Sequence, residues 1–153
     1  MITTRIISTG ACVPEQVITN DDLSKIVDTS DEWIAQRTGI KRRHISAGEN
    51  TSYFAINTAR QVLERAEVSA EDVDLIIVAS VTADYGTPSL ACMVQKEIGA
   101  VNAVAFDVNA ACSGFMFALS IADKYIKTGM YENAIVIGAE TLSKIVDWKD
   151  RST

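Results

Sequence analysis

The hydrophobic positions of this chain form two short uninterrupted runs and several longer amphipathic stretches. The runs, Leu75–Ala79 and Ala134–Gly138, contain only apolar residues and one glycine. Runs of this kind are typical of strands that are covered on both faces, as in parallel sheets. The segment 51–66 instead places its apolar residues three and four positions apart, which predicts a helix with one buried face. We therefore expect strands and helices to alternate in a mostly parallel α/β sheet with right-handed crossovers.

Capping residues and glycines predict where the other elements begin and end. A hydroxyl or amide side chain at the start of a helix accepts hydrogen bonds from its free amides, and a glycine readily adopts the left-handed conformation that ends it. Ser30 with Gly39, and Ser89 with Gly99, bound two such segments, and Thr51 is the expected cap of the helix at 51–66. The remaining expected elements are a first strand at 5–13, a short helix from Asn20 to Val27, and a strand at 103–108.

A single cysteine follows the strand expected at 103–108. Small and polar residues surround Cys112 between Asn109 and Gly114, and apolar residues without strand-like alternation follow from Phe115. This order predicts a strand, a tight turn and a helix, with Cys112 at or next to the first helical turn. The positive end of a helix dipole favours a thiolate, so Cys112 is the candidate nucleophile.

A thiolate in an apolar site needs a base or a cation beside it, most often a histidine. The chain has one histidine, His44, in the basic run Lys41–His44, which is far from Cys112 in sequence. The sequence thus contains a nucleophile without an evident partner. We interpret the basic run as a solvated surface turn rather than a phosphate-binding patch.

The helix expected after Cys112 is apolar almost all the way round in its first half. Between Phe115 and Ala122 only Ser120 is polar, and charged residues begin at Asp123. A surface helix would keep one polar face along its whole length. We therefore expect this helix to be covered on both sides, and a single sheet supplies only one of the two layers.

Composition argues against several classes of protein. The 153 residues carry 14 Lys and Arg against 20 Asp and Glu, a formal net charge of −6, so nucleic acid is not an expected partner. The cysteines, Cys12, Cys92 and Cys112, lack metal-ligand spacing, and we expect no metal site and small core roles for the first two. No signal-peptide pattern is present, and no run approaches the ~20 apolar residues of a membrane span. We expect a cytoplasmic protein that does not enter a membrane.

Several segments together resemble one enzyme family. Asp107–Phe115, around the cysteine, is similar to the nucleophile motif of the thiolase-fold condensing enzymes, in their β-ketoacyl-acyl-carrier-protein synthase III branch. Other segments share the family's pattern: Ile7–Gly10 with Pro14, Thr29–Ile34, Arg37–Ile40, Arg43–Ile45, Gly138–Glu140 and Asp147–Thr153. The resemblance implies an α/β, thiolase-like fold, of which residues 1–153 form the N-terminal half, with a mostly parallel sheet and a buried helix that carries the cysteine. It further implies that a C-terminal half, absent from these residues, supplies the second sheet.

The resemblance also implies roles for individual residues. Cys112 is then the acylated nucleophile, while Thr29, Trp33, Arg37 and Arg151 bind coenzyme A, with Arg151 closing on the adenine from the face opposite Trp33. From the residues alone, Trp33 and Arg37 share a helix face because they are four apart, and a core tryptophan with an arginine in a surface ion pair is the favoured interpretation. The family's pattern reverses that preference.

Thr87 marks a departure from the family's pattern. Several relatives carry a phenylalanine before Pro88, and in the family's homodimer it reaches the acyl pocket of the partner subunit. Because threonine is smaller, we expect Thr87 to leave room for primers longer than acetyl.

The activity implied by the resemblance is the first condensation of fatty-acid biosynthesis. Cys112 takes an acyl group from acyl-coenzyme A, malonyl-acyl-carrier protein loses carbon dioxide, and the resulting carbanion attacks the acyl-cysteine to give β-ketoacyl-acyl-carrier protein. Coenzyme A is a substrate here, and no cofactor is expected. A histidine and an asparagine that stabilise developing oxyanions belong to the family's C-terminal half, so this half alone is expected to be inactive. Two alternatives stay open: a related enzyme of polyketide or quinolone type, and a non-catalytic half-length subunit.

Overall fold

The computed structural model describes residues 2–151, and these divide into two compact units. Unit 1 comprises Asn50–Glu140 together with the N-terminal residues up to Cys12. Unit 2 comprises Val13–Glu49 together with the residues from Thr141 onward. The sequence pattern did not indicate this division.

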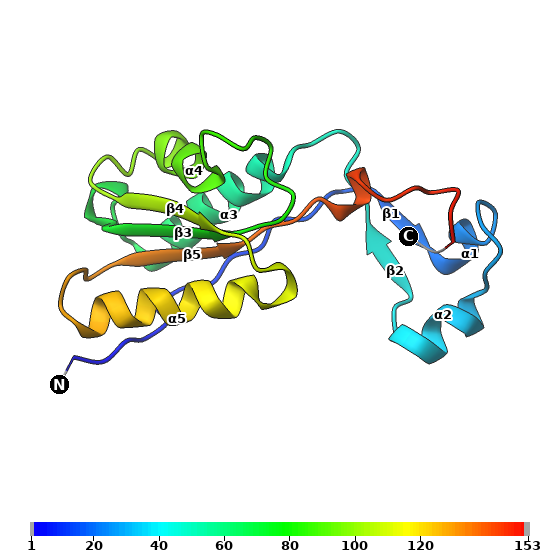
Figure 1. Ribbon diagram of the computed structural model, residues 1–153, viewed down its shortest axis with the longest axis horizontal. Helices are drawn as coiled ribbons and strands as arrows, with labels where there is room; N and C mark the ends of the chain where they lie inside the picture. The colour runs from blue at the N-terminus through cyan, green and yellow to red at the C-terminus, as the bar shows by residue number, and fades with distance from the viewer. Residues whose placement is uncertain (1, 152–153) are drawn as a thin grey trace. The chain divides into compact units, whose positions relative to one another are not determined.

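Unit 1 is built on a three-stranded parallel sheet with the strand order β4-β3-β5 (Figure 1). The strands are β3 (Leu75–Ala79), β4 (Val104–Val108) and β5 (Ala134–Gly138). The central strand pairs Leu75 with Val104 on one side and with Ala134 on the other. All five residues of β3 are buried, which explains why its sequence is apolar without alternation. These strands and their parallel arrangement confirm the prediction.

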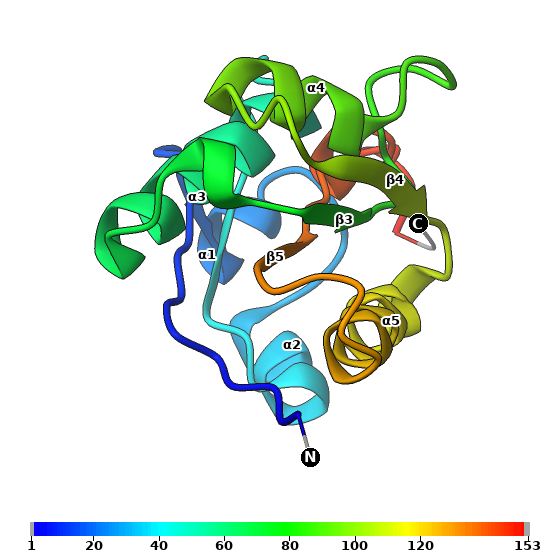
Figure 2. The ribbon, with the colours of Figure 1, turned by 90° about the vertical axis from the view of Figure 1, so that its left-hand side faces the viewer.

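Helices cover both faces of this sheet, as Figures 1 and 2 show. The helices are α3 (Thr51–Ala66), α4 (Leu90–Ile98) and α5 (Gly114–Lys127), with a 3₁₀ turn at Ala70–Asp72. Side chains of β3 alternate between the two layers, so Ile76 packs with α3 and α4 whereas Ile77 packs with α5. The carboxyl ends of the strands meet at one edge of the sheet, where the segment that carries Cys112 leaves β4.

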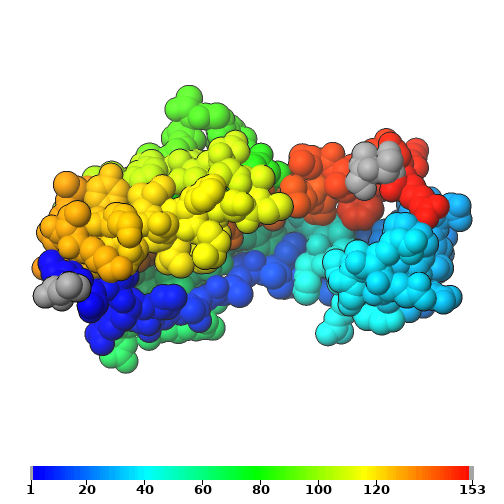
Figure 3. All heavy atoms as spheres, turned by 60° about the horizontal axis from the view of Figure 1, so that its bottom comes forward, coloured from blue at the N-terminus to red at the C-terminus, as the bar shows by residue number. Residues whose placement is uncertain are grey.

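Only one side of α5 is covered. Ala118 and Ala122 are buried against the sheet, whereas Phe115, Met116 and Phe117 are 44%, 62% and 54% exposed. Figure 3 shows this helix, coloured yellow to orange, at the surface of the face in view. The second layer that the sequence predicts over this helix is not supplied by residues 2–151.

The strand expected at residues 5–13 is not formed, and this prediction was wrong. The segment runs beside α3, where the Ser8 hydroxyl donates to the Val62 carbonyl oxygen at 2.9 Å. Residues 3–10 and the strand β5 line one groove, together with residues of α3 and α5. The segment forms no ladder with the edge strand β5, which shows that the β-propensity of its side chains alone does not make it a strand.

Unit 2 consists of two short helices and a two-stranded antiparallel sheet. Its elements are β1 (Val17–Thr19), α1 (Asn20–Leu23), α2 (Asp31–Thr38), β2 (Arg42–His44) and a 3₁₀ turn at Leu142–Lys144. Helix α2 begins after Ser30, whose hydroxyl accepts from the Trp33 amide, and ends at Gly39 with φ +72°. Both ends of α2 confirm the prediction. The short sheet was not predicted, because three-residue strands leave no measurable alternation.

Two predicted caps were wrong for the same reason. Helix α1 is capped by Thr19 and not by Asn20, because the Asn20 side chain is used in contacts outside the helix, and α1 ends at Leu23, short of the expected Val27. Helix α3 has Asn50 at its cap position, because the Thr51 hydroxyl donates to the Thr82 carbonyl oxygen at 2.5 Å. A side chain engaged in a tertiary hydrogen bond is not available to cap its own helix.

Candidate functional site

Cys112 lies in a single 3₁₀ turn, Ala111–Ser113, between β4 and α5. The turn leads directly into Gly114, the first residue of α5, so the sulfur lies at the N-terminal end of that helix. The thiol is free and its residue is exposed. This position confirms the predicted turn, and it places the candidate nucleophile where helix amides point their partial positive charge.

The backbone around Cys112 is held in an unusual conformation. Ala111 has φ +46°, a left-handed value that costs a residue with a side chain on the order of 1–3 kcal/mol. A β-carbon added to Gly114 would lie 3.1 Å from the β-carbon of Ala79 on β3, closer than ordinary packing allows. Together, the left-handed residue and the bare glycine turn the chain sharply and bring the start of α5 close against the sheet.

The loop between β3 and α4, which carries Thr87, is tied at both ends. At its start, the Glu140 carboxylate accepts from the Val81 amide at 2.8 Å and from the Thr82 hydroxyl at 2.5 Å. At its end, the Asp107 carboxylate accepts from the amides of the first two residues of α4, both at 2.7 Å. Asp107 belongs to β4, so the strand that leads to Cys112 also fixes the start of α4. Thr87 itself is exposed within this loop.

In unit 2, two arginines lie over one tryptophan ring. The guanidinium carbon of Arg37 is 4.3 Å from the centroid of Trp33, and that of Arg151 is 4.8 Å from it. Both distances lie in the cation–π range. Trp33 is 40% exposed, so the interpretation from the residues alone, a tryptophan packed in the core, does not hold. Arg151 also lies 3.6 Å from the Asp28 carboxylate.

The gap between Trp33 and Arg151 is too small to admit a flat ring. A base stacked between them needs two contacts of about 3.5 Å, or roughly 7 Å in total, against the 4.8 Å observed. A planar ligand stacked between Trp33 and Arg151 must therefore displace Arg151. Arg151 belongs to the segment Asp147–Thr153. Its last two residues, Ser152 and Thr153, lie outside the described residues.

Thr29 directly precedes the cap of α2. Its hydroxyl oxygen is buried and has no hydrogen-bond partner. A buried hydroxyl in that state carries an unmet hydrogen-bonding demand.

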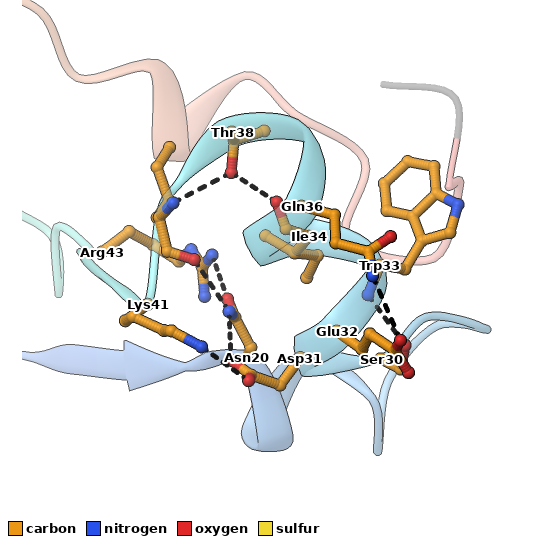
Figure 4. A network of polar contacts seen from close by, with 11 residues as sticks. Asn20, Ser30, Asp31, Glu32, Trp33, Ile34, Gln36, Thr38, Lys41 and Arg43 are labelled. Carbon is orange, nitrogen blue, oxygen red and sulfur yellow. Dashed lines mark hydrogen bonds and ion pairs between the residues drawn. The ribbon is translucent and has the colours of Figure 1, made fainter.

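A polar network holds α2 in unit 2 (Figure 4). The buried Asn20 side chain bonds to Asp31 at 2.7 Å, to the Ile40 carbonyl oxygen at 2.8 Å and to Arg43 at 2.6 Å. The Lys41 ammonium pairs with the Asp31 carboxylate at 2.8 Å. This pair and the Asn20 hydrogen bond lower the pKa of Asp31, with Lys41 as the larger cause.

The His44 imidazole forms a hydrogen bond within unit 2. Its Nδ1 lies 2.6 Å from the Pro14 carbonyl oxygen, so in this arrangement Nδ1 carries the proton and donates. The structure therefore gives His44 a hydrogen-bonding role within its own unit.

The structure brings some of the predicted site residues together and leaves others apart. Trp33, Arg37 and Arg151 form one cluster in unit 2, the unit that also contains Thr29. Cys112 and Thr87 belong to unit 1, Cys112 on the turn after β4 and Thr87 on the loop before α4. The two groups lie in different units.

Comparison with known proteins identifies the family. The model of the 3-oxoacyl-[acyl-carrier-protein] synthase III family matches residues 106–153. β-Ketoacyl-[acyl-carrier-protein] synthase III of Clostridium novyi is 56% identical over the whole of this chain and 47% of its own length. The chain belongs to this family.

Solved structures of synthase III proteins agree with the sequence match. The crystal structure of the Aquifex aeolicus synthase III superposes with a TM-score of 0.95 at 54% identity, over 98% of this chain and 49% of that one. The priming β-ketosynthase of the R1128 polyketide pathway superposes with a TM-score of 0.92 at 34% identity, over 97% and 45%. The chain thus has the α/β, thiolase-like fold of the synthase III family, and it spans about half the length of the curated relatives it matches.

The sequence did not predict the hydrogen bonds by which three residues hold the segments around the candidate site. Asp107 had a signal, since it is the one charged residue in the apolar strand Val104–Val108. Glu140 and Asn20 had none, because the bonds they make join segments far apart in sequence.

Among residues 2–151, no group of three or more His, Cys, Asp or Glu is arranged to hold a metal ion. No helix in the same range has the length and apolar character needed to cross a membrane.

Proposed function

We propose that this chain is the N-terminal half of a β-ketoacyl-acyl-carrier-protein synthase III, a condensing enzyme that starts fatty-acid biosynthesis. The observation that carries the proposal is the exposed Cys112 at the N-terminal end of α5, behind the left-handed Ala111. A nucleophile on a strained turn at a helix start is accessible to a substrate and lies where helix amides direct their partial positive charge.

The proposed reaction has two stages. The Cys112 thiolate attacks the thioester carbonyl of acyl-coenzyme A, and free coenzyme A leaves as the acyl-cysteine forms. Malonyl-acyl-carrier protein then loses carbon dioxide, and the carbon left with the electron pair attacks the acyl-cysteine and releases the Cys112 thiolate. Cysteine suits both stages because a thiolate is a good nucleophile and a good leaving group. The Cys112 amide is a candidate donor to the oxyanion of the first stage.

The proposal requires a C-terminal half. Its histidine and asparagine would bind the oxyanion of the second stage, and its sheet would cover α5. The exposure of Phe115, Met116 and Phe117 supports this, since adjacent apolar side chains this open are costly for a free surface. Residues 1–153 alone would then be inactive in condensation.

Unit 2 would bind the nucleotide of coenzyme A. The adenine would stack on Trp33, with Arg151 moving off the ring to close over it, and Arg37 would meet phosphate. Thr29, directly before the cap of α2, would contribute to the same site, in keeping with the family's pattern. Coenzyme A enters as a substrate, and the chemistry needs no cofactor.

The choice of primer would depend on a homodimer. Thr87 lies exposed on its loop, available to contact a partner subunit, and its small side chain would leave room for primers longer than acetyl. The second candidate function is a priming enzyme of a polyketide-type pathway. The R1128 priming ketosynthase supports it through its close superposition with this chain.

The test is acylation of Cys112. We would join this chain to the C-terminal half of the Clostridium novyi relative, a construction called the joined protein here. Intact mass and peptide mapping follow incubation with acetyl-, butyryl- and octanoyl-coenzyme A. We expect an acyl group on Cys112, no adduct in the Cys112→Ala variant, and β-ketoacyl product when malonyl-acyl-carrier protein is added.

Each other outcome has a defined meaning. A joined protein without any adduct contradicts the proposed activity and favours a non-catalytic, half-length subunit. An adduct on another residue contradicts the assignment of Cys112. Acylation without fatty β-ketoacyl product, but with turnover of other extenders, favours the polyketide-type alternative.

A further inference from the structure

We propose that Asn20 is a positioning residue for the coenzyme A nucleotide: it holds both ends of α2 and so sets the orientation of Trp33 and Arg37. The inference rests on the proposed function, since it concerns the same binding site. No sequence motif assigns Asn20 such a role, and its side chain touches neither Trp33 nor Arg37 through a hydrogen bond.

The Asn20 side chain forms hydrogen bonds at both ends of α2. Its Nδ2 donates to Oδ1 of Asp31, the first residue of α2, at 2.7 Å. The same nitrogen donates to the carbonyl oxygen of Ile40, just beyond the glycine that ends α2, at 2.8 Å. Figure 4 shows Asn20 and Asp31 side by side. One amide group thereby fixes the start and the end of an eight-residue helix.

Asn20 also connects α2 to the two-stranded sheet. Its Oδ1 accepts from Nη2 of Arg43 on β2 at 2.6 Å, and its backbone amide donates to the Lys41 carbonyl oxygen at 3.3 Å. Both donors and the oxygen of the amide are therefore used, in a residue that is 1% exposed. Satisfied polar networks of this kind specify one geometry.

Packing alone does not orient α2. Ile34 is the one buried residue of the helix, while Trp33, Arg37 and Thr38 are exposed. A single apolar contact leaves a helix free to tilt and to turn about its axis. The ties at its two ends remove that freedom, so the face that carries Trp33 and Arg37 depends on Asn20.

The chemistry of position 20 is specific. Two donors and one acceptor are needed within the reach of one short side chain, and asparagine provides them. Aspartate has the same shape but no donor, and it would turn an oxygen toward the Asp31 carboxylate and the Ile40 carbonyl. Asn20→Asp is therefore a nearly isosteric substitution that weakens the hydrogen bonds to the two ends of α2, and Asn20→Ala removes them altogether.

The experiment compares two substrates in the joined protein. Acetyl-coenzyme A carries the nucleotide, whereas acetyl-pantetheine delivers the same thioester without it. For Asn20→Asp and Asn20→Ala we expect KM for acetyl-coenzyme A to rise roughly tenfold, about 1.4 kcal/mol of binding free energy. We expect kcat with either substrate, and KM for acetyl-pantetheine, to stay within roughly twofold of wild type.

Two further variants sharpen the result. Asn102→Ala in unit 1 is the matched control, since its amide also donates to a backbone carbonyl, that of Glu71 at 2.9 Å, in an exposed place. It is expected to match wild type with both substrates. Adding Asp31→Asn to Asn20→Asp restores a donor and an acceptor between positions 20 and 31, and should recover part of the lost affinity.

The outcomes separate this inference from the activity it rests on. An unchanged KM for acetyl-coenzyme A overturns the role of Asn20 while the proposed function stands. Equal losses with both substrates, or unfolding of both variants, show that Asn20 serves general stability, which also overturns it. A wild-type joined protein that acylates Cys112 equally well from both substrates overturns the nucleotide site itself, and one that acylates from neither contradicts the proposed function.

Discussion

The two units position their candidate site residues by different physical means. In unit 1, Cys112 follows a strand that pairs with the fully buried β3, and apolar layers cover both faces of the sheet. Among the described residues of unit 2, only Ile34 and Ile45 are buried hydrophobic residues, and a buried asparagine joins the elements. One unit relies on close packing, and the other relies on directed polar contacts.

This difference suits the tasks proposed for the two units. A nucleophile must stay within a fraction of an ångström of its productive position, which a packed sheet and helix provide. A nucleotide site must open and close, since Arg151 has to leave the Trp33 ring before a base can stack there. Polar contacts on a lightly packed unit permit that movement at low cost.

The largest expected effect is loss of packing in unit 1. Ile76 is fully buried against α3 and α4, and Ile76→Ala should lower the free energy of unfolding by about 2–5 kcal/mol. Both tryptophans, Trp33 and Trp148, lie in unit 2. Urea unfolding of the chain should therefore show a large shift of the circular-dichroism midpoint and a smaller shift of the fluorescence midpoint.

Val101→Ala is the matched control for that measurement. Val101 is 74% exposed, and its truncation should change stability by less than about 0.5 kcal/mol. Equal shifts of both midpoints in Ile76→Ala would show that the two units unfold as one, which contradicts the contrast drawn between them.

The next largest effect concerns the acyl group and leaves the nucleotide site alone. Thr87→Phe in the joined protein should place a ring where a long acyl chain is proposed to lie. We expect the ratio of octanoyl to acetyl transfer to Cys112 to fall by roughly 10²-fold, with KM for acetyl-coenzyme A little changed. Competition between the two thioesters, followed by mass spectrometry, measures that ratio. A wild-type protein that already rejects octanoyl-coenzyme A would remove the basis for this prediction.

Local signals predicted much of the fold. The caps and stops of α2 and α4 were found because Ser30, Gly39, Ser89 and Gly99 act within their own helices. The wrong caps at Asn20 and Thr51 arose because those side chains serve distant segments. The expected strand at 5–13 failed for a related reason: a strand must pair with a neighbour, and β-propensity alone does not make it pair.

The candidate site also combines features that a local sequence pattern predicts with features that depend on distant segments. The place of Cys112 follows from a strand, small residues and a helix in succession, and Trp33 and Arg37 are neighbours because they are four apart on α2. The approach of Arg151 to Trp33 depends on the chain returning to unit 2 after Glu140, which no local pattern reveals. The tie between Asp107 and α4 is likewise a property of the folded chain.

A smaller effect is expected where α5 meets the sheet. In Gly114→Ala, the added β-carbon would lie 3.1 Å from that of Ala79, so the start of α5 must shift by a few tenths of an ångström. The better helix propensity of alanine, about 1 kcal/mol, offsets most of the steric cost to stability. The shift moves Cys112, and we expect its acylation rate to fall roughly tenfold with coenzyme A affinity unchanged.

Gly86→Ala is the control for that substitution. No atom lies within 4 Å of a β-carbon added there, and Gly86 has no left-handed φ. Rapid mixing of the joined protein with acetyl-coenzyme A, followed by mass analysis, gives the acylation rate. An unchanged rate in Gly114→Ala would show that the close contact with Ala79 does not set the position of the nucleophile.

The smallest expected effect is a difference in acid sensitivity between the two units. In unit 2, the Lys41 ammonium and then Asn20 lower the pKa of Asp31 below its ordinary value of 3.8. In unit 1, Lys127 lowers the pKa of Asp123 to about 2 from a position one turn along α5. A carboxylate whose pKa is lowered by folding stabilises the folded state fully above its unfolded pKa, and this stabilisation is lost as the pH falls through the lowered value.

Protonation of these two aspartates should have unequal consequences for structure. Helix α5 stays in place through Ala118 and Ala122, whereas α2 loses one of the few contacts that orient it. In a Trp148→Phe background, the fluorescence of Trp33 should change as the pH falls below the ordinary aspartate pKa of 3.8, and Asp31→Asn should abolish that change while Asp123→Asn leaves it intact. The result expected from this contrast is a pH response that follows Asp31 alone. A response that persists in Asp31→Asn would mean that packing, rather than the polar network, holds α2 in unit 2.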